Sequence, residues 1–337
     1  MTDQSSPSPY YRSKIAGTGS YLPEKTLTNK DLEKLVDTSD EWILERTGIS
    51  TRHLVEEGQY TSDLALVASN MALKEAGLKA QDIDMILVAT VSGDYIMPTT
   101  ACVLQTKLGA TDCMALDISA ACSGFIYGLS IADQFIKTGQ YKNVLIVGAE
   151  VLHNLVDYTD RNTCILFGDG AGACVLTRAE ESEDSQIYST HLHADGKISH
   201  LFELLGGGSA YPTSQETLDK GLHHLQMNGR EIFKHAVRTM SKCCDEALAA
   251  NKMSPEEVNW VIPHQANVRI MEAVAKHFGI SMDKVINEIQ HMGNISAATV
   301  IVAMDRAIRD GRIQRGQNLL LTAFGAGITS GSALLKY

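Results

Sequence analysis

The chain alternates short apolar runs with longer stretches in which apolar residues recur at helical spacing. Runs of this kind, bounded by turn residues, are typical of strands in a sheet that helices cover on both faces. They predict strands at residues 14–17, 85–89, 115–118, 144–147, 173–176, 260–262 and 319–323. Helical periodicity predicts helices over 62–76 and 229–249. The alternation of the two element types indicates an α/β protein.

One unit of this pattern occurs twice. Residues 121–124 (Ala-Cys-Ser-Gly) and residues 293–296 (Gly-Asn-Ile-Ser) each open an apolar helical stretch. The two stretches align at one constant offset, which relates position 122 to 294 and position 139 to 311, and the strand at 143–148 recurs at 318–323 with nearly the same offset. We infer a duplicated chain. Two copies packed about a pseudo-twofold axis would place Cys122 beside Asn294.

Three polar side chains converge in this arrangement. His264 follows the strand predicted at 260–262, where a chain leaving the edge of a sheet faces a cleft. Cys122 begins a helix, whose dipole lowers the pKa of a thiol and favours a nucleophilic thiolate. Neutral His264 and Asn294 can donate hydrogen bonds to an enolate, which suits loss of CO2 from a malonyl thioester. Taken singly, the three also fit a packed cysteine, a satisfied histidine and a helix cap.

Composition narrows the class of protein. The 337 residues are 44% hydrophobic, enough for a large core, and the net charge of −11 argues against a nucleic-acid partner. No apolar run approaches the roughly 18 residues of a membrane span, so we expect a soluble, cytoplasmic protein without membrane association. The seven cysteines show no C-x-x-C pair and no zinc spacing, which predicts no disulfide framework and no metal site.

Local composition suggests how the chain is divided. The Ser/Pro-rich residues 1–11 predict a disordered lead-in, and an acidic turn at 180–185 predicts a boundary between halves 12–185 and 186–337. The glycine-rich residues 168–173 lead into a strand-like run, which excludes a dinucleotide fingerprint. The three glycines at 206–208 lack the Lys-Ser/Thr of a phosphate loop and fit a flexible linker.

Over residues 12–337 the chain resembles the β-ketoacyl-acyl carrier protein synthase III family of the thiolase superfamily. The matching motifs are Asp40-Glu41-Trp42-Ile43, Arg46-Thr47-Gly48-Ile49, Ala120-Ala121-Cys122-Ser123-Gly124, Phe167-Gly168-Asp169-Gly170-Ala171-Gly172-Ala173, His264-Gln265-Ala266-Asn267-Val268-Arg269-Ile270, Gly293-Asn294-Ile295-Ser296 and Phe324-Gly325-Ala326-Gly327. The resemblance implies a thiolase-like, duplicated, five-layered αβαβα sandwich and a homodimer. It also implies that a short acyl-CoA primer, such as acetyl-CoA, condenses with malonyl-acyl carrier protein to start fatty acid synthesis. No cofactor is implied, because the phosphopantetheine is carried by the partner.

The resemblance also assigns roles to residues. Cys122 matches the acylated nucleophile, and His264 and Asn294 match the decarboxylation site, while the backbone of Cys122 and Ala326 matches the oxyanion hole. The other groups are CoA-binding residues (Trp42, Arg46, Arg161), acyl-pocket residues (Met97, Phe233, Phe324) and carrier-protein-binding residues (Arg269, Lys276, Lys234, Arg230).

The chain departs from the family pattern around the acyl pocket. Met97 stands where many members have Phe, at a position that comes from the partner subunit, and Ile328 and Ser330 occupy positions that are often aromatic. A flexible thioether at the pocket boundary leaves room for a branched or longer primer.

Three other functions fit parts of the pattern. A condensing enzyme of secondary metabolism would have the same three residues and another primer or acceptor. A papain-like cysteine hydrolase would share the order Cys122, His264, Asn294, although the context C-G-[SA]-C-[WY] is missing. A binding protein with an inactive site would not need all three residues.

Overall fold

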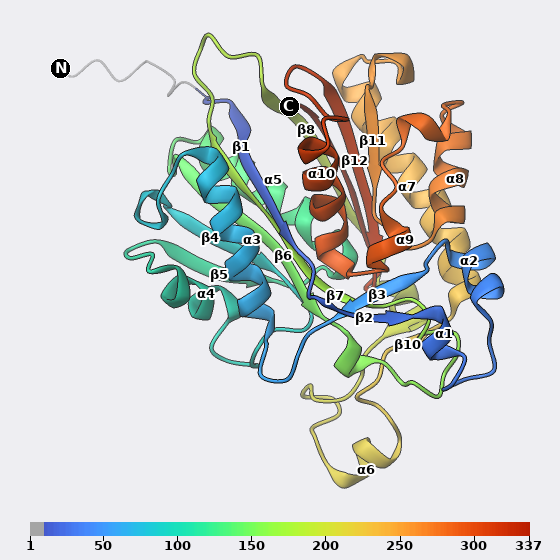
Figure 1. Ribbon diagram of the computed structural model, residues 1–337. Helices are drawn as coiled ribbons and strands as arrows, with labels where there is room; N and C mark the ends of the chain where they lie inside the picture. Colours follow the sequence, from blue (N-terminus) through green and yellow to red (C-terminus); the bar gives the residue numbers. More distant parts are fainter. Residues whose placement is uncertain (1–9) are drawn as a thin grey trace.

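Two mixed β-sheets form the frame of the protein, which a computed structural model describes for residues 10–337 (Figure 1). The predicted lead-in at 1–11 therefore lies almost entirely outside the described residues. The strands of the first sheet, in spatial order, are β1 (Ser13–Tyr21), β7 (Asp169–Arg178), β6 (Asn143–Val151), β4 (Met85–Ala89) and β5 (Met114–Ile118). Those of the second are β8 (Gln186–Ala194), β13 (Thr329–Lys336), β12 (Asn318–Gly325) and β11 (Trp260–Pro263).

The two sheets have the same topology. In the first, β4 pairs in parallel with β5 and β6, and β7 and β1 follow antiparallel. In the second, β11 and β12 are parallel, and β13 and β8 follow antiparallel. A parallel bridge from Val261 to Val285 stands where β5 lies in the first sheet. This repeated order supports the inferred duplication.

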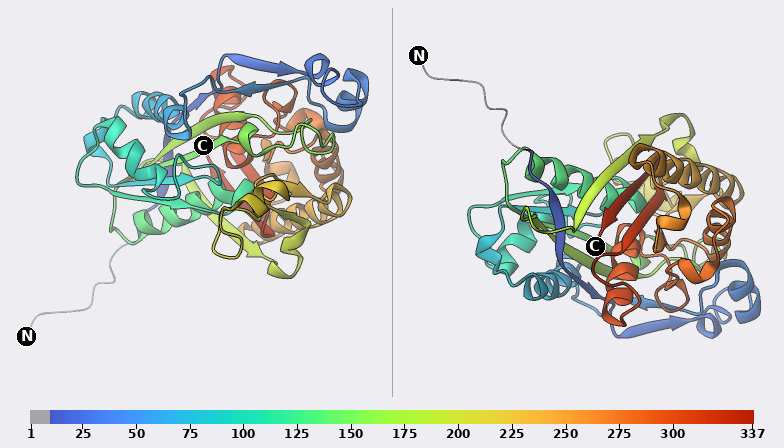
Figure 2. Two further views of the ribbon diagram at one scale, coloured as in Figure 1. Left: turned by 90° about the horizontal axis from the view of Figure 1, so that it is seen from below. Right: turned by 90° about the horizontal axis from the view of Figure 1, so that it is seen from above.

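Helices complete five layers around the sheets (Figures 1 and 2). The outer face of the first sheet is covered by α3 (Thr61–Ala76) and α4 (Thr100–Leu108). Between the sheets, α5 (Gly124–Lys137) and α10 (Thr299–Arg309) contact strands of both. The outer face of the second sheet carries α7 (Gly229–Asn251), which packs on α8 (Val268–His277). The αβαβα order matches the expectation.

Smaller elements lie around this frame. They are β2 (Lys25–Thr28), β3 (Thr51–Leu54), β9 (Phe202–Glu203), β10 (Gln226–Met227), α1 (Asn29–Leu32), α2 (Asp40–Thr47), α6 (Gln215–Asp219) and α9 (Ile289–Met292). The glycine-rich segment 204–214 leads to α6, which projects from the body in Figure 1. Within residues 10–337, every helix is too short or too polar to cross a bilayer.

The seven predicted strands and the two predicted helices are present. The segment 168–173 enters β7, as expected of a strand rather than a nucleotide-binding helix. Two strands of the main sheets were not predicted, β8 and β13. In β8 most side chains are only half-buried and polar residues interrupt the apolar ones, so the strand lacks a continuous apolar run.

The offset inferred for the duplication needs a correction at the helix starts. The turns before α5 and α10 begin at Ala121 and Ser296, with φ of +46° and +47°, so these two residues are the equivalent pair. The offset that relates 122 to 294 holds only at the helix ends, because α5 has 14 residues and α10 has 11. Cys122 is therefore equivalent to Ala297, and Asn294 lies just before the turn.

Candidate active site

A cavity of about 990 Å³ brings together Cys122, His264 and Asn294. Cys122 lies in the turn before α5, His264 directly after β11, and Asn294 just before the turn that opens α10. The three residues are 4%, 2% and 5% exposed. The three residues therefore line one cavity, as expected. However, Cys122 and Asn294 do not occupy equivalent positions in the two copies of the repeated unit.

The Cys122 turn is packed tightly against the end of β12. A Cβ added to Gly325 would lie 2.6 Å from the Cys122 nitrogen, and one on Gly124 would lie 2.9 Å from the Ala89 Cβ. Burial raises the pKa of the Cys122 thiol to about 12; a hydrogen bond from Ser296 lowers it, and the charge of Glu150 raises it further. Burial therefore favours the neutral thiol, in contrast to the sequence argument that a helix dipole favours the thiolate.

His264 is a neutral imidazole held by Thr299. Burial lowers its pKa to about 3, so it carries no charge near neutral pH. Its Nδ1 lies 2.6 Å from Thr299 Oγ1, and that hydroxyl can also donate to the Ser296 carbonyl at 3.0 Å. His264 carries a proton on Nε2 when Thr299 donates to Nδ1, and on Nδ1 when Thr299 donates to Ser296. The tautomer of His264 is therefore coupled to the direction in which the Thr299 hydroxyl donates.

The side chain of Asn294 has a defined orientation. Its Oδ1 accepts the Ser296 amide at 2.9 Å, which leaves the Nδ2 hydrogens as the available donors. Its backbone is held on both sides, donating to the Leu166 carbonyl at 2.9 Å and accepting from the Gly168 amide at 3.1 Å. Asn294 caps a turn rather than α10, which begins at Thr299.

The aromatic and basic residues assigned to CoA meet at one edge of the cavity. Ser39 caps α2 by accepting the Trp42 amide at 3.1 Å. The guanidinium carbons of Arg46 and Arg161 lie 4.7 and 4.2 Å from the centre of the Trp42 ring. Trp42 and Arg46 line the cavity that contains Cys122. An aromatic ring between two cations is suited to a nucleotide base and its phosphates.

Five of the remaining candidates also line this cavity. They are the aromatic residues Phe233 and Phe324 and the basic residues Arg230, Lys234 and Arg269. The guanidinium of Arg269 lies 5.6 Å from the centre of the Phe233 ring. The basic and aromatic candidates therefore share one surface.

Four candidates do not line the cavity. Arg161 contacts Trp42 at its edge, and the other three lie apart from it. Lys276, at the far end of α8, lines another depression with Arg238 and Lys242. Met97 is 82% exposed in the loop between β4 and α4. Ala326 follows β12, and its carbonyl accepts from Thr329 Oγ1, which also donates to the Ala120 carbonyl at 2.8 Å. It is Gly325, one residue earlier, that lines the cavity.

Sequence reasoning did not find two polar residues near the site. Thr299 has no local signature, because it is the first residue of a buried helix. Glu150 closes the apolar strand β6 and is fully buried, and its burial raises the pKa of its carboxyl group to about 7. A carboxylate at the end of an apolar run was a visible signal. It accepts hydrogen bonds from Ser92 Oγ at 2.5 Å and the Val91 amide at 3.1 Å.

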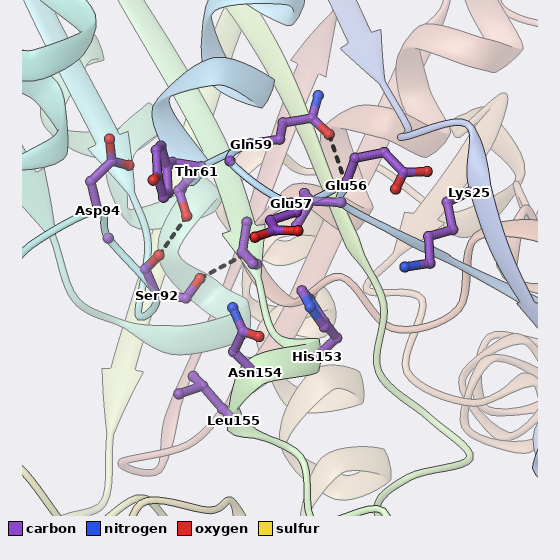
Figure 3. A pocket seen from close by; sticks show the side chains of 15 residues that line it. Lys25, Glu56, Glu57, Gln59, Thr61, Ser92, Asp94, His153, Asn154 and Leu155 are labelled. Carbon is purple, nitrogen blue, oxygen red and sulfur yellow. Dashed lines mark hydrogen bonds between the residues drawn. The ribbon is translucent and has the colours of Figure 1, made fainter.

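A second cavity, of about 460 Å³, shares no lining residue with the first (Figure 3). Its wall is polar and includes Glu56, Glu57, Asp94, His153 and Lys25. No cysteine lines it, so of these two cavities only the larger one has a thiol in its wall.

Comparison with known proteins identifies the family. The model described as 3-oxoacyl-[acyl-carrier-protein (ACP)] synthase III matches residues 116–196, and the model of its C-terminal part matches residues 248–337. Beta-ketoacyl-[acyl-carrier-protein] synthase III of Xanthomonas campestris pv. campestris strain 8004 is 53% identical over 326 residues, which cover 96% of this chain and 98% of that protein. The chain belongs to the β-ketoacyl-acyl carrier protein synthase III family.

Solved structures agree with this assignment. The crystal structure of 3-oxoacyl-[acyl-carrier-protein] synthase III from Aquifex aeolicus VF5 has a TM-score of 0.90 and 47% identity, covering 96% of this chain and 100% of that one. The priming β-ketosynthase of the R1128 polyketide pathway also has a TM-score of 0.90, at 30% identity and 98% coverage of both chains. The chain is thus a condensing acyltransferase of the thiolase fold. The papain-like hydrolase was a wrong alternative.

Proposed function

We propose that this synthase III family member transfers a short acyl group from acyl-CoA to Cys122 and condenses it with malonyl-acyl carrier protein. The reaction yields a 3-oxoacyl-acyl carrier protein, CoA and CO2, and starts fatty acid synthesis. The observation that carries this proposal is the single cavity joining the Trp42 and Arg46 edge to Cys122, His264 and Asn294. The halves 12–185 and 186–337 supply the nucleophile and the two donors, respectively.

The first half-reaction is acyl transfer to sulfur. The Cys122 sulfur attacks the thioester carbonyl, the carbon–sulfur bond to CoA breaks, and the thiol proton ends on the departing CoA sulfur. The backbone amides of Cys122 and Ala326 stabilise the oxyanion. Glycine at 325 supports this role, because a side chain there would collide with the Cys122 nitrogen. The Trp42, Arg46 and Arg161 group holds the nucleotide end of CoA.

The second half-reaction is decarboxylative condensation. The malonyl carboxylate leaves as CO2, and the electron pair it leaves forms an enolate, whose oxygen accepts hydrogen bonds from His264 Nε2 and Asn294 Nδ2. The enolate carbon then attacks the acyl carbonyl, and the Cys122 sulfur leaves as a thiolate, which takes up a proton from solvent. Neutral donors suit this step, and the low pKa of His264 supports a neutral imidazole. No cofactor is required, since phosphopantetheine arrives on the carrier protein.

The carrier protein binds at the basic edge of the cavity. Arg230, Lys234 and Arg269 lie there in a chain of net charge −11, so the edge is a local exception that fits an acidic partner. Lys276 belongs to the same surface at its outer end, two helical turns from Arg269 along α8.

A homodimer completes the acyl pocket. The edge strand β5 has its outer side unpaired within residues 10–337, and the neighbouring loop exposes Tyr95, Ile96 and Met97 by 61%, 91% and 82%. The base of this loop is fixed, because Thr61 Oγ1 donates to the Ser92 carbonyl at 2.5 Å and Ser92 Oγ accepts the Val151 amide at 2.8 Å (Figure 3). A rigid base with an apolar tip suits insertion into a second copy of the chain, where Met97 would bound the primer.

One experiment separates the primer alternatives. The purified protein is incubated with a panel of straight and branched acyl-CoAs and malonyl-acyl carrier protein, and the products are identified by mass spectrometry. A 3-oxoacyl-acyl carrier protein from a short primer supports the proposal. Transfer only to another acceptor, or only from an aromatic or long primer, would instead favour a priming enzyme of secondary metabolism.

A further inference from the structure

A histidine, a cysteine and a glutamate meet behind the wall of the active-site cavity. Among the described residues, one group of metal-ligand side chains has its donor atoms within 4.8 Å of one another, and it consists of His193, Cys243 and Glu246. His193 lies near the end of β8, while Cys243 and Glu246 lie one helical turn apart on α7. No zinc spacing was visible in the sequence, because the ligands come from two elements that are distant along the chain.

Backbone hydrogen bonds hold two of the three residues in position. The His193 carbonyl accepts from Tyr127 Oη at 2.8 Å, and the Cys243 carbonyl accepts from Ser332 Oγ at 2.6 Å. Two of the donor atoms are in contact, since His193 Nε2 lies 2.5 Å from Glu246 Oε2, while the Cys243 thiol donates to Ser330 Oγ at 3.7 Å. Strand and helix positions of this kind hold ligands more firmly than loops.

The site opens on one side into a separate cavity. This cavity, of about 390 Å³, is lined by His193 and Ser330 and by the cationic residues Arg238 and Lys242, while Cys243 and Glu246 do not line it. Lys242 Nζ lies 3.7 Å from Glu246 Oε1, and a bound cation would replace this ion pair. The side chain of His193 is 44% exposed and that of Glu246 is 30% exposed, whereas Cys243 is fully buried. A tetrahedral zinc ion has ligand atoms roughly 3.3–3.8 Å apart. Rotation of the two exposed side chains would bring the donor atoms to that spacing, with water from the cavity as the fourth ligand.

We propose that His193, Cys243 and Glu246 form a binding site for a borderline-soft divalent cation, of which Zn²⁺ is the best match. Imidazole nitrogen, thiolate sulfur and carboxylate oxygen are the three donor types that zinc takes, and the sulfur disfavours Mg²⁺ and Ca²⁺. On binding, the cation forms a bond to the Cys243 sulfur, and the thiol proton is released to solvent. The ion replaces the direct contact between His193 and Glu246.

The site ties a wall of the active-site cavity to the second sheet. Met240 and Ala236, one and two turns before Cys243 on α7, line the cavity that contains Cys122. A cation bridging α7 and β8 fixes this wall, and stabilises the folded chain because the unfolded chain does not hold the three ligands together.

Cobalt(II) spectroscopy tests the site directly. The protein carries Cys122→Ala, so that the active-site thiol cannot contribute, and is titrated with Co²⁺ alone. We expect a thiolate-to-cobalt charge-transfer band that saturates at one equivalent, and a rise in the thermal midpoint with Zn²⁺. Adding Cys243→Ala should abolish the band. The matched control, Cys102→Ala, removes an exposed free cysteine and should leave it unchanged.

Two more variants keep the test decisive if Cys243→Ala fails to fold. His193→Gln and Glu246→Gln should each weaken cobalt affinity by more than about tenfold, because each removes a ligand and loss of even a supporting contact costs that much. The absence of a charge-transfer band, its persistence without Cys243, or unchanged affinity in both glutamine variants would overturn the proposal. None of these results bears on the condensation reaction at Cys122.

Discussion

Replacing Asn294 should slow decarboxylation and leave acylation nearly unchanged, because only one end of its side-chain amide is available to the substrate. The Oδ1 atom is occupied by the Ser296 amide at 2.9 Å, so only Nδ2 can donate to an enolate. Asn294→Ala removes that donor. Asn294→Asp keeps an oxygen for the Ser296 amide but puts a second oxygen where Nδ2 stood.

The expected magnitude follows from the loss of one preorganised donor. Removing such a donor lowers the rate by about 10²–10³, or about 2.7–4 kcal/mol. We expect Asn294→Ala to slow CO2 release from malonyl-acyl carrier protein by that factor. Asn294→Asp should be at least as slow, since a carboxylate facing the enolate adds repulsion to the missing hydrogen bond. Acylation of Cys122 by acyl-CoA should remain nearly unchanged in both.

The assay measures the half-reactions one at a time. A burst of labelled acyl group on the protein reports acylation, and labelled CO2 from malonyl-acyl carrier protein reports decarboxylation. Asn287→Ala is the matched control, because Asn287 Oδ1 also accepts an amide two residues ahead, that of Ile289 at 3.3 Å, but the residue lines no part of the cavity. CO2 release at the normal rate in both Asn294 variants would refute the assignment, and equal loss of both half-reactions would show that Asn294 only supports the fold.

Four further predictions test other parts of the site. Thr299→Val removes the hydroxyl to which the His264 tautomer is coupled, and should lower CO2 release about tenfold, the effect of one hydrogen bond of about 1.4 kcal/mol, while acylation changes less. Acyl-CoA should label Cys122 in peptide mapping. The pKa of the Cys122 thiol is raised to about 12, so its thiolate fraction grows with pH and alkylation of the free enzyme should rise about tenfold per pH unit from 7 to 10. A plateau in the alkylation rate near pH 7 would show instead that the helix dipole lowers this pKa. Met97→Phe should lower activity on long or branched primers more than on acetyl-CoA, and an unchanged primer profile would place Met97 outside the pocket. Arg269→Glu should weaken the reaction with malonyl-acyl carrier protein in a salt-dependent way and leave self-acylation intact. Lys276→Glu should have a weaker effect, because Lys276 lies farther from the cavity. An equal loss of both half-reactions in Arg269→Glu would assign Arg269 to CoA binding or to structure.

The sequence predicted most of the strands that are buried on both faces. The buried strand β13 was missed, because Ser330, Gly331 and Ser332 interrupt its apolar residues. The central strands β4, β6 and β12 are continuous apolar runs, since both faces of each sheet are covered by helices. The strand β8 escaped prediction because it is only partly covered. The candidate residues Cys122, His264 and Asn294 were found because each stands beside an apolar stretch of the chain.

The sequence did not reveal how the two copies align residue by residue, or how deeply individual side chains are buried. The offset between the two copies changes within the helices, because the shorter helix α10 is followed by a longer loop, which no local pattern reveals. The pKa of Cys122 was expected to fall, whereas desolvation of the buried thiol raises it. Likewise, His193 and Cys243 become neighbours only through the packing of α7 on β8.

The two duplicated turns, which contain Cys122 and Ala297, differ in their surroundings. The turn that holds Cys122 packs on β12 of the other half, and its equivalent, the turn that holds Ala297, packs on β6 of the first half. At the strand end facing Cys122 stands Gly325, and the equivalent position on β6 is Glu150. Glycine leaves the Cys122 turn open to the cavity, whereas Glu150 is fully buried and accepts hydrogen bonds from Ser92 and Val91. The second turn has alanine in place of cysteine and a buried carboxyl group in place of glycine. Because of these two pairs of differences, the symmetric frame has one cysteine-containing turn that opens to the cavity.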